Sequence, residues 1–148
     1  MSVVKSKRSK SSIEFERLYF LMTDGMDNLV QHDFWAEGLL AEKNRKFLDA
    51  RANTLQKLTD DLLFHIKVAN SIYPTCMLEL EERRLSMDRA IGTCFTILTC
   101  LQRIMQRLRI PDNKYTLDIT NIQKLINSLK AWRKSDNKFK VTLRQQSA

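Results

Sequence analysis

The residue types that carry out most enzyme chemistry are few in this sequence and widely spaced. The two histidines, His32 and His65, lie far apart and have no carboxylate or cysteine at the spacing of metal ligands, which argues against a zinc site. The three glycines, Gly25, Gly38 and Gly92, stand alone, whereas a loop that cradles phosphate needs glycines close together. The sequence therefore predicts no catalytic residues, no metal site and no cofactor.

The cysteines favour free thiols in a reducing compartment. Cys76, Cys94 and Cys100 are odd in number and form no C-x-x-C pair, and no apolar signal segment follows the basic start of the chain. We therefore expect a cytoplasmic protein. Cys94 occupies an apolar helical position, and Cys76 lies beside an expected helix start, where a thiol pKa can fall. A structural role is the simpler interpretation of Cys76.

The carboxylates do not suggest an acid–base pair. Glu81, Glu82 and Asp88 lie at helical spacing from Arg84, Arg89 and their neighbours, a pattern typical of a solvated, ion-paired face. The chain also has no run of about 18 uncharged apolar residues, the length that a membrane-spanning helix needs. We expect a soluble protein that is not an enzyme and does not bind membranes.

The basic residues are the remaining candidates, because the net charge of +8 is concentrated at the two ends. Residues 1–10 carry +4 and residues 130–148 carry +5, which leaves −1 for the rest of the chain. Tails with one sign of charge either improve solubility or bind a polyanion, and composition leaves both open. The bases concerned are Lys5, Lys7, Arg8 and Lys10 at the start, and Lys130, Arg133, Lys134, Lys138, Lys140 and Arg144, with Asp136 among them, at the end.

Four segments with apolar residues at steps of three and four must position these groups. The clearest runs from residue 80 to 108, which predicts a long helix packed lengthwise against others. Few glycines and prolines make a sheet improbable. The expected stripes are Ile13, Phe15, Leu18, Met22, Met26 and Leu29; Leu48, Ala52, Leu55, Leu62, Ile66 and Ala69; Leu80, Met87, Ile91, Cys94, Leu98, Leu101, Met105 and Leu108, interrupted only by Arg84; and Leu117, Ile122, Leu125, Ile126, Leu129 and Trp132.

The predicted fold is all-α: an antiparallel up-down-up-down four-helix bundle over residues 11–134, with basic, poorly ordered tails at 1–10 and 135–148. A capping box from Ser11 to Glu14 begins the first helix, and Asp24-Gly25 either interrupts that helix or forms a turn. Residues 31–35 read as a connection. Pro74 ends the second helix, Thr75 caps the third, and residues 110–113 form the last turn.

Antiparallel packing would gather the bases into two zones about 45 Å apart, the length of a 30-residue helix. At one end both tails approach Arg83 and Arg84. Trp132 among these bases has the chemistry to stack on a nucleobase, although its place on the apolar stripe favours the core. At the other end, the bases of the second helix meet those of the third; these are Lys43, Arg45, Lys46 and Arg51, and Arg103, Arg107 and Arg109.

Four stretches carry a resemblance to a known family: ANSIYPT at 69–75, EERR at 81–84, DRAIG at 88–92 and LKAWRKSDNK at 129–138. They resemble the four-helix-bundle accessory variability determinant of diversity-generating retroelements. More distantly, they are similar to proteins encoded in intervening sequences of bacterial large-subunit ribosomal RNA. The similar stretches span residues 65–140 and contain no catalytic motif.

This resemblance implies a basic homo-oligomeric ring, for example a pentamer, that binds the reverse transcriptase of the element and its RNA or DNA. Such a protein assists error-prone copying of a template repeat without being an enzyme itself. The two basic zones would then contact phosphates. Two alternatives remain open: a structural or assembly bundle whose charges only improve solubility, and a ribosomal-RNA-associated bundle with no polymerase partner.

Overall fold

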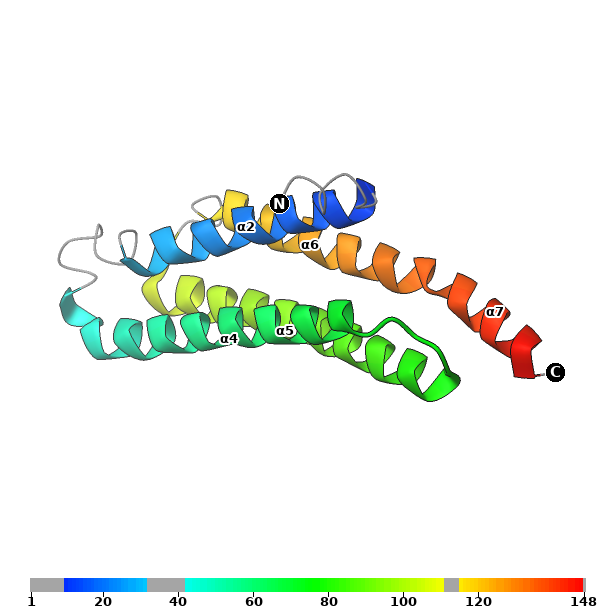
Figure 1. The fold of residues 1–148 in the computed structure, drawn as a ribbon. Coiled ribbons are helices and arrows are strands. Elements are labelled where there is room, and N and C mark those ends of the chain that lie inside the picture. The colour runs from blue at the N-terminus through cyan, green and yellow to red at the C-terminus, as the bar shows by residue number, and fades with distance from the viewer. Residues whose placement is uncertain (1–9, 32–41, 111–114, 148) are drawn as a thin grey trace, which may run out of the picture.

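The protein is all-helical in the residues that the structure, a computed structural model, describes: 10–31, 42–110 and 115–147. Four long helices are followed by a shorter one: α2 (Lys10–Gln31), α4 (Arg45–Ser71), α5 (Met77–Leu108), α6 (Thr116–Ser135) and α7 (Asn137–Ser147) (Figure 1). These ranges contain no strand. The all-helical prediction is confirmed.

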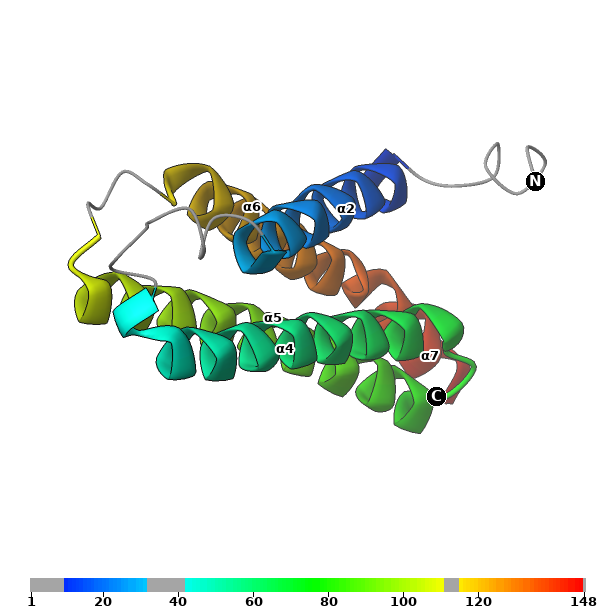
Figure 2. The same ribbon diagram turned by 90° about the vertical axis from the view of Figure 1, so that its left-hand side faces the viewer.

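The long helices lie in two pairs, one on top of the other. Helix α4 packs along most of its length against α5, and α2 packs mainly on α6 (Figures 1 and 2). The two pairs are held together mainly by contacts between α5 and α6. Contacts at both ends fix the direction of α4 relative to α5. Near the start of α5, the Arg83 side chain donates a hydrogen bond to the carbonyl of Ala69 near the end of α4. At the end of α5, the Arg107 guanidinium lies over the ring of Phe47 at the start of α4. These contacts require α4 and α5 to run antiparallel.

Where side chains are described, the core is built from the stripes that the sequence predicted, with two local shifts. The predicted Ile13, Phe15 and Leu18 of the first stripe lie outside the described side chains. On α5 the fully buried positions include Ile97, Leu101 and Ile104, so the predicted Leu98 lies at the flank and is only partly buried. On α6 Leu117 is 73% exposed and Ile119 packs against the core instead. Because an α-helix turns by about 100° per residue, Leu117, five residues before the buried Ile122, lies on the side of α6 that faces away from the core.

Gly25 does not interrupt α2, so the turn at Asp24-Gly25 that the sequence left open is wrong. A Cβ atom at Gly25 would lie 2.5 Å from Oδ1 of Asp118 in the first turn of α6. A side chain at position 25 would therefore require the Asp118 carboxylate to move. The expected capping box at Ser11 and Glu14, the connection at 32–35 and the last turn at 111–113 involve side chains or segments outside the described residues.

The turn between α4 and α5 places Cys76, rather than the predicted Thr75, at the helix cap. The Cys76 side chain makes no capping hydrogen bond to the helix. Instead, the carboxylate of Glu79 accepts hydrogen bonds from the hydroxyl and from the backbone N–H of Thr75, the latter at 3.0 Å. These bonds to Thr75 lower the pKa of Glu79 below its usual value. Glu79 therefore fastens the turn to the first turn of α5.

The C-terminal tail, predicted to be poorly ordered, forms α7 over residues 137–147. Phe139 and Leu143, one helical turn apart, give α7 an apolar side. Leu143 is buried, and the Phe139 ring meets the Tyr73 ring edge-on with 5.5 Å between ring centres. This short apolar pair holds the last helix against α5 and the α4–α5 turn.

Candidate nucleic-acid interface

A buried ion pair organises the end of the bundle where the C-terminal bases gather. Arg83 of α5 is 9% exposed, and Asp136, between α6 and α7, is 2% exposed. The Arg83 guanidinium donates to both carboxylate oxygens, with Nε 2.7 Å from Oδ2 and a terminal nitrogen 3.2 Å from Oδ1. It also donates to the carbonyls of Ala69 and Ile72, at 3.3 and 2.8 Å. One side chain therefore ties α5 to the end of α4 and to the α6–α7 junction.

This placement corrects the prediction that Arg83 contacts phosphate. The Arg83 guanidinium carbon lies 5.1 Å from the centre of the Trp132 ring and 5.7 Å from the centre of the Phe139 ring. The two aromatic rings therefore cover the guanidinium group in addition to its hydrogen bonds. Arg83 is a positioning residue inside the fold. Trp132 is partly buried and packs against the core, the placement that its apolar stripe favoured over base stacking.

The bases of α6 and α7 form the outer layer over this pair. Lys130, Lys134 and Lys138 are exposed, whereas Arg133 and Lys140 are half-buried. Three of the five have a described partner. The Arg133 guanidinium lies 2.5 Å from Oδ1 of Asp88, and the ammonium groups of Lys130 and Lys138 lie over the Phe95 and Phe139 rings. We call these five bases, Lys130, Arg133, Lys134, Lys138 and Lys140, together with the half-buried Arg84, the C-terminal zone.

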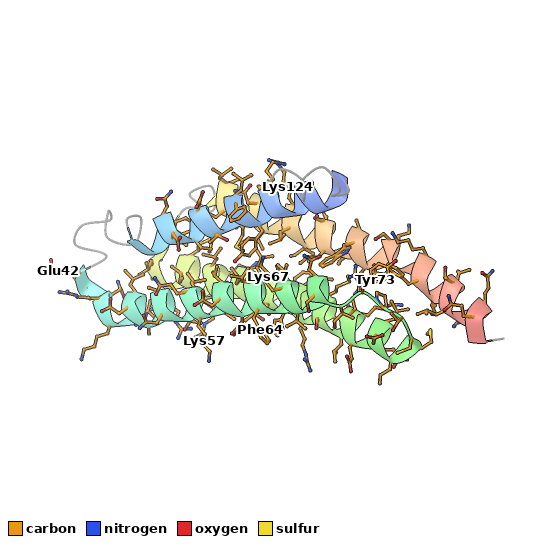
Figure 3. All side chains as sticks on the ribbon, viewed as in Figure 1. Glu42, Lys57, Phe64, Lys67, Tyr73 and Lys124 are labelled. Carbon is orange, nitrogen blue, oxygen red and sulfur yellow. The ribbon has the colours of Figure 1, made fainter. Side chains whose placement is uncertain are left out.

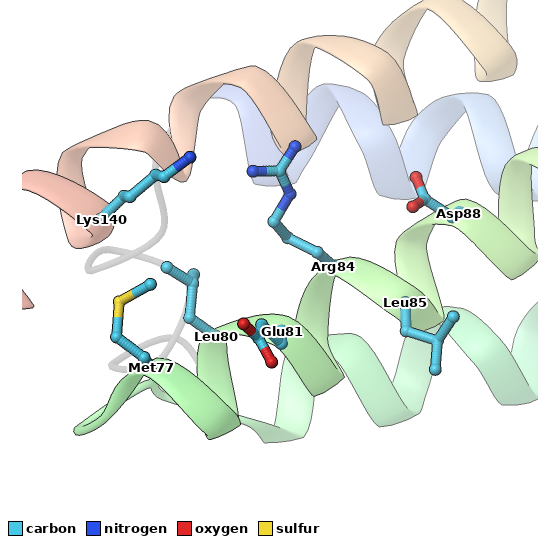
Figure 4. A pocket seen from close by; sticks show the side chains of 7 residues that line it. All are labelled: Met77, Leu80, Glu81, Arg84, Leu85, Asp88 and Lys140. Atoms are coloured by element: carbon cyan, nitrogen blue, oxygen red, sulfur yellow. The ribbon is translucent and has the colours of Figure 1, made fainter.

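A shallow cavity of about 350 Å³ opens between α5 and α7 within the C-terminal zone. Figure 4 shows the guanidinium of Arg84 and the ammonium of Lys140 reaching toward each other from opposite helices. Glu81 and Asp88 supply two carboxylates beside them, and apolar side chains line the rest, namely Met77, Leu80 and Leu85. The lining therefore combines two positive and two negative side chains with apolar ones.

The second basic zone is also assembled from two helices. Arg51 of α4 and Arg107 of α5 place their guanidinium carbons 5.8 and 5.6 Å from the centre of the same ring, that of Phe47. Arg103 lies one turn before Arg107 and is exposed. We call Arg51, Arg103 and Arg107 the arginine cluster. The other predicted members, Lys43, Arg45, Lys46 and Arg109, are exposed near the same ends of α4 and α5.

The two buried thiols are protonated at neutral pH. Burial raises the pKa of Cys94 to about 12. Burial also raises the pKa of Cys100, although the charges of Arg51 and Arg103 act in the opposite direction. None of the three cysteines forms a disulfide; Cys76 is exposed, whereas Cys94 and Cys100 are buried. At neutral pH the buried thiols are protonated and therefore poor nucleophiles.

Part of the predicted nucleic-acid interface lies outside the residues that the structure describes. Lys5, Lys7 and Arg8 fall before residue 10, and Lys10 begins α2 without a described side chain. In the described ranges, no three His, Cys, Asp or Glu side chains come together as a metal site. None of the helices in those ranges has both the length and the apolar character to cross a membrane.

Sequence reasoning missed the partners of the basic residues. Asp136 appeared only as a charge to subtract, and Phe47 lay outside the predicted stripe of α4. The spacing of Phe47 and Arg51, four residues apart, was a usable signal for their contact. Comparison of the chain with known protein families, with curated proteins and with solved structures found no match.

Proposed function

We propose that this protein is a non-enzymatic, nucleic-acid-binding accessory factor of a retroelement reverse transcriptase. The proposal takes the four long helices as an up-down-up-down bundle that assembles into a basic homo-oligomer. Its function would be to help the polymerase copy a template repeat during mutagenic retrohoming. The C-terminal zone is the observation that carries the nucleic-acid part, and the resemblance of residues 65–140 carries the polymerase part.

The geometry of the C-terminal zone favours contacts with the phosphate backbone. Lys130, Lys134 and Lys138 are exposed on successive turns of α6 and α7, and none of the three forms an ion pair with a described residue. Lysine ammonium groups act as point charges toward phosphate and read little sequence. We therefore expect binding that is sensitive to salt and indifferent to sequence.

A matched pair of charge variants tests this proposal. The first replaces Lys130, Lys134 and Lys138 with Gln. The control replaces three other exposed lysines, Lys57, Lys67 and Lys124, which lie on other parts of α4 and α6 (Figure 3). Both variants lose three charges, so a difference between them measures position rather than net charge.

We expect the first variant alone to lose affinity for unrelated RNA and DNA sequences alike, measured by fluorescence anisotropy. Losing three phosphate contacts lowers the slope of log affinity against log salt by about 2 to 3. Equal losses in both variants would mean that only net charge matters. Absence of binding by the wild type at low salt would favour the structural or assembly alternative.

The polymerase and assembly parts have their own tests. A reverse-transcriptase gene beside this one, with paired template and variable repeats, would support the retroelement assignment, and co-purification of the two proteins would establish the partner. Light scattering that gives a monomer mass at micromolar concentration would contradict the ring. A protein that binds RNA but no polymerase would instead fit the ribosomal-RNA-associated bundle.

A further inference from the structure

Two pairs of residues, each one helical turn apart, meet at the opposite end of the bundle from α7. Phe47 and Arg51 lie on one side of α4, and Arg103 and Arg107 lie on one side of α5. Because α4 and α5 run antiparallel, the two sides face the same place. The guanidinium carbons of Arg51 and Arg107 both lie within 6 Å of the Phe47 ring centre, at 5.8 and 5.6 Å. Phe47 itself packs against the core and so provides a fixed platform.

Within residues 10–31, 42–110 and 115–147, the positive charge of this arginine cluster is not balanced by an ion pair, because no carboxylate there pairs with Arg51, Arg103 or Arg107. Among the described residues, the buried Nε of Arg51 has no hydrogen-bond acceptor, although the Arg51 side chain also interacts with the thiol of Cys100, where it opposes the rise in pKa that burial causes. A buried donor without an acceptor destabilises the folded protein, so an acceptor from a ligand would be favourable here. Arg83, the buried arginine at the other end, shows the usual solution, since it makes four hydrogen bonds.

We propose that Arg51, Arg103 and Arg107 form a binding site for a phosphate monoester, with Phe47 holding two of the guanidinium groups in place. A phosphate monoester carries a charge of about −1.5 to −2 and three acceptor oxygens. Three guanidinium groups match that charge and number of oxygens, and each fork can donate two parallel hydrogen bonds. An internal phosphodiester has a single charge and leaves part of the cluster unsatisfied.

This inference does not depend on the proposed function for its ligand chemistry, but that function supplies one source. The terminal phosphate of a nucleic-acid strand is a monoester, and so are nucleotides; free inorganic phosphate has the same charge and geometry. The site would differ from the C-terminal zone in kind. Lysines spread over α6 and α7 suit any backbone phosphate, whereas the arginine cluster concentrates its donors at one point.

Isothermal titration with inorganic phosphate, at constant ionic strength set by chloride, tests the site directly. The variants Arg51→Lys and Arg107→Lys keep the charge and remove the fork. Each is expected to weaken phosphate binding about tenfold or more, since one hydrogen bond to a charged group contributes about 1.5–3 kcal/mol. The matched control is Arg89→Lys, an exposed arginine of α5 without a described ion pair, which should bind as the wild type does.

Two further readings separate a built site from general attraction. Affinity for inorganic phosphate should rise as the pH passes through the neutral range, because the ligand loses its second proton there and becomes a dianion. Arg107 is exposed, so Arg107→Lys keeps the test valid if Arg51→Lys melts at a lower temperature. Absence of phosphate binding by the wild type, or equal weakening in all three arginine variants, would overturn the site.

A pair of oligonucleotides of one sequence, with and without a 5′-phosphate, identifies the source. Tighter binding of the phosphorylated strand that disappears in Arg107→Lys would support the site with a strand end as its ligand. Phosphate binding with no preference between the strands would support the site with a small phosphate as its ligand. The proposed function fails separately, when the Lys130, Lys134 and Lys138 variant leaves RNA and DNA binding unchanged.

Discussion

Replacing Asp136 with alanine is expected to remove about 3–5 kcal/mol from the free energy of unfolding, because it leaves the Arg83 guanidinium buried without a counter-charge. The structure supports this magnitude. Asp136 is 2% exposed and accepts two hydrogen bonds from Arg83. Bonds of this charged kind contribute about 1.5–3 kcal/mol each, and two of them reach the same range.

Urea denaturation followed by circular dichroism measures the effect. With a slope of about 2 kcal/mol per molar urea, the midpoint should fall by about 1.5–2.5 M. The control is Asp88→Ala, which breaks the surface pair with Arg133. That pair is the shorter one, at 2.5 Å against 2.7 Å, but the Asp88 side chain is 50% exposed. We expect a loss of about 0–1 kcal/mol there, because water screens exposed pairs.

The comparison tests burial against distance as the source of stability. If Asp136→Ala loses less than Asp88→Ala, the reasoning from burial is wrong. A double variant, Arg83→Met with Asp136→Leu, removes both charges and should recover part of the loss. It should not recover all of it, because the carbonyls of Ala69 and Ile72 lose their Arg83 donors.

Three further predictions address the core and the thiols. Leu101→Asp should abolish cooperative thermal melting, because Leu101 is 0% exposed, whereas Leu98→Asp at the flank should melt cooperatively at a lower temperature. In the native protein a thiol reagent should label Cys76 fast and the buried thiols slowly. Because the pKa of Cys94 is about 12 in the folded protein and 9.0 in the unfolded chain, the unfolded chain loses this proton first as the pH rises. The free energy of unfolding should therefore fall between pH 9 and pH 12, and it should fall less in Cys94→Ala. Trp132→Ala should lower the melting temperature and leave RNA affinity unchanged, since the ring packs against the core.

Much of the fold was predictable because apolar spacing alone determines which side of a helix is buried. The stripes of α4 and α5 and most of that of α6 follow the predicted residues. The shift from Leu98 to Ile97 and Ile104 arises because two adjacent apolar residues fit the same spacing equally well. Helix α7 was missed because its apolar side consists of Phe139 and Leu143 alone, too few residues for a periodic signal.

The candidate site was less predictable, because charge in a sequence says nothing of pairing across distant segments. Arg83 and Arg84 are neighbours in the chain, yet one bonds to Asp136, 53 residues later, and the other lines an open cavity. The buried pair removes one base and one acid from the surface together. Counting Asp136 against the C-terminal bases therefore understates the outward charge of α6 and α7, since its charge is already balanced inside. The surface that a polyanion meets there depends on the exposed lysines, and it is their positions that the matched variants test.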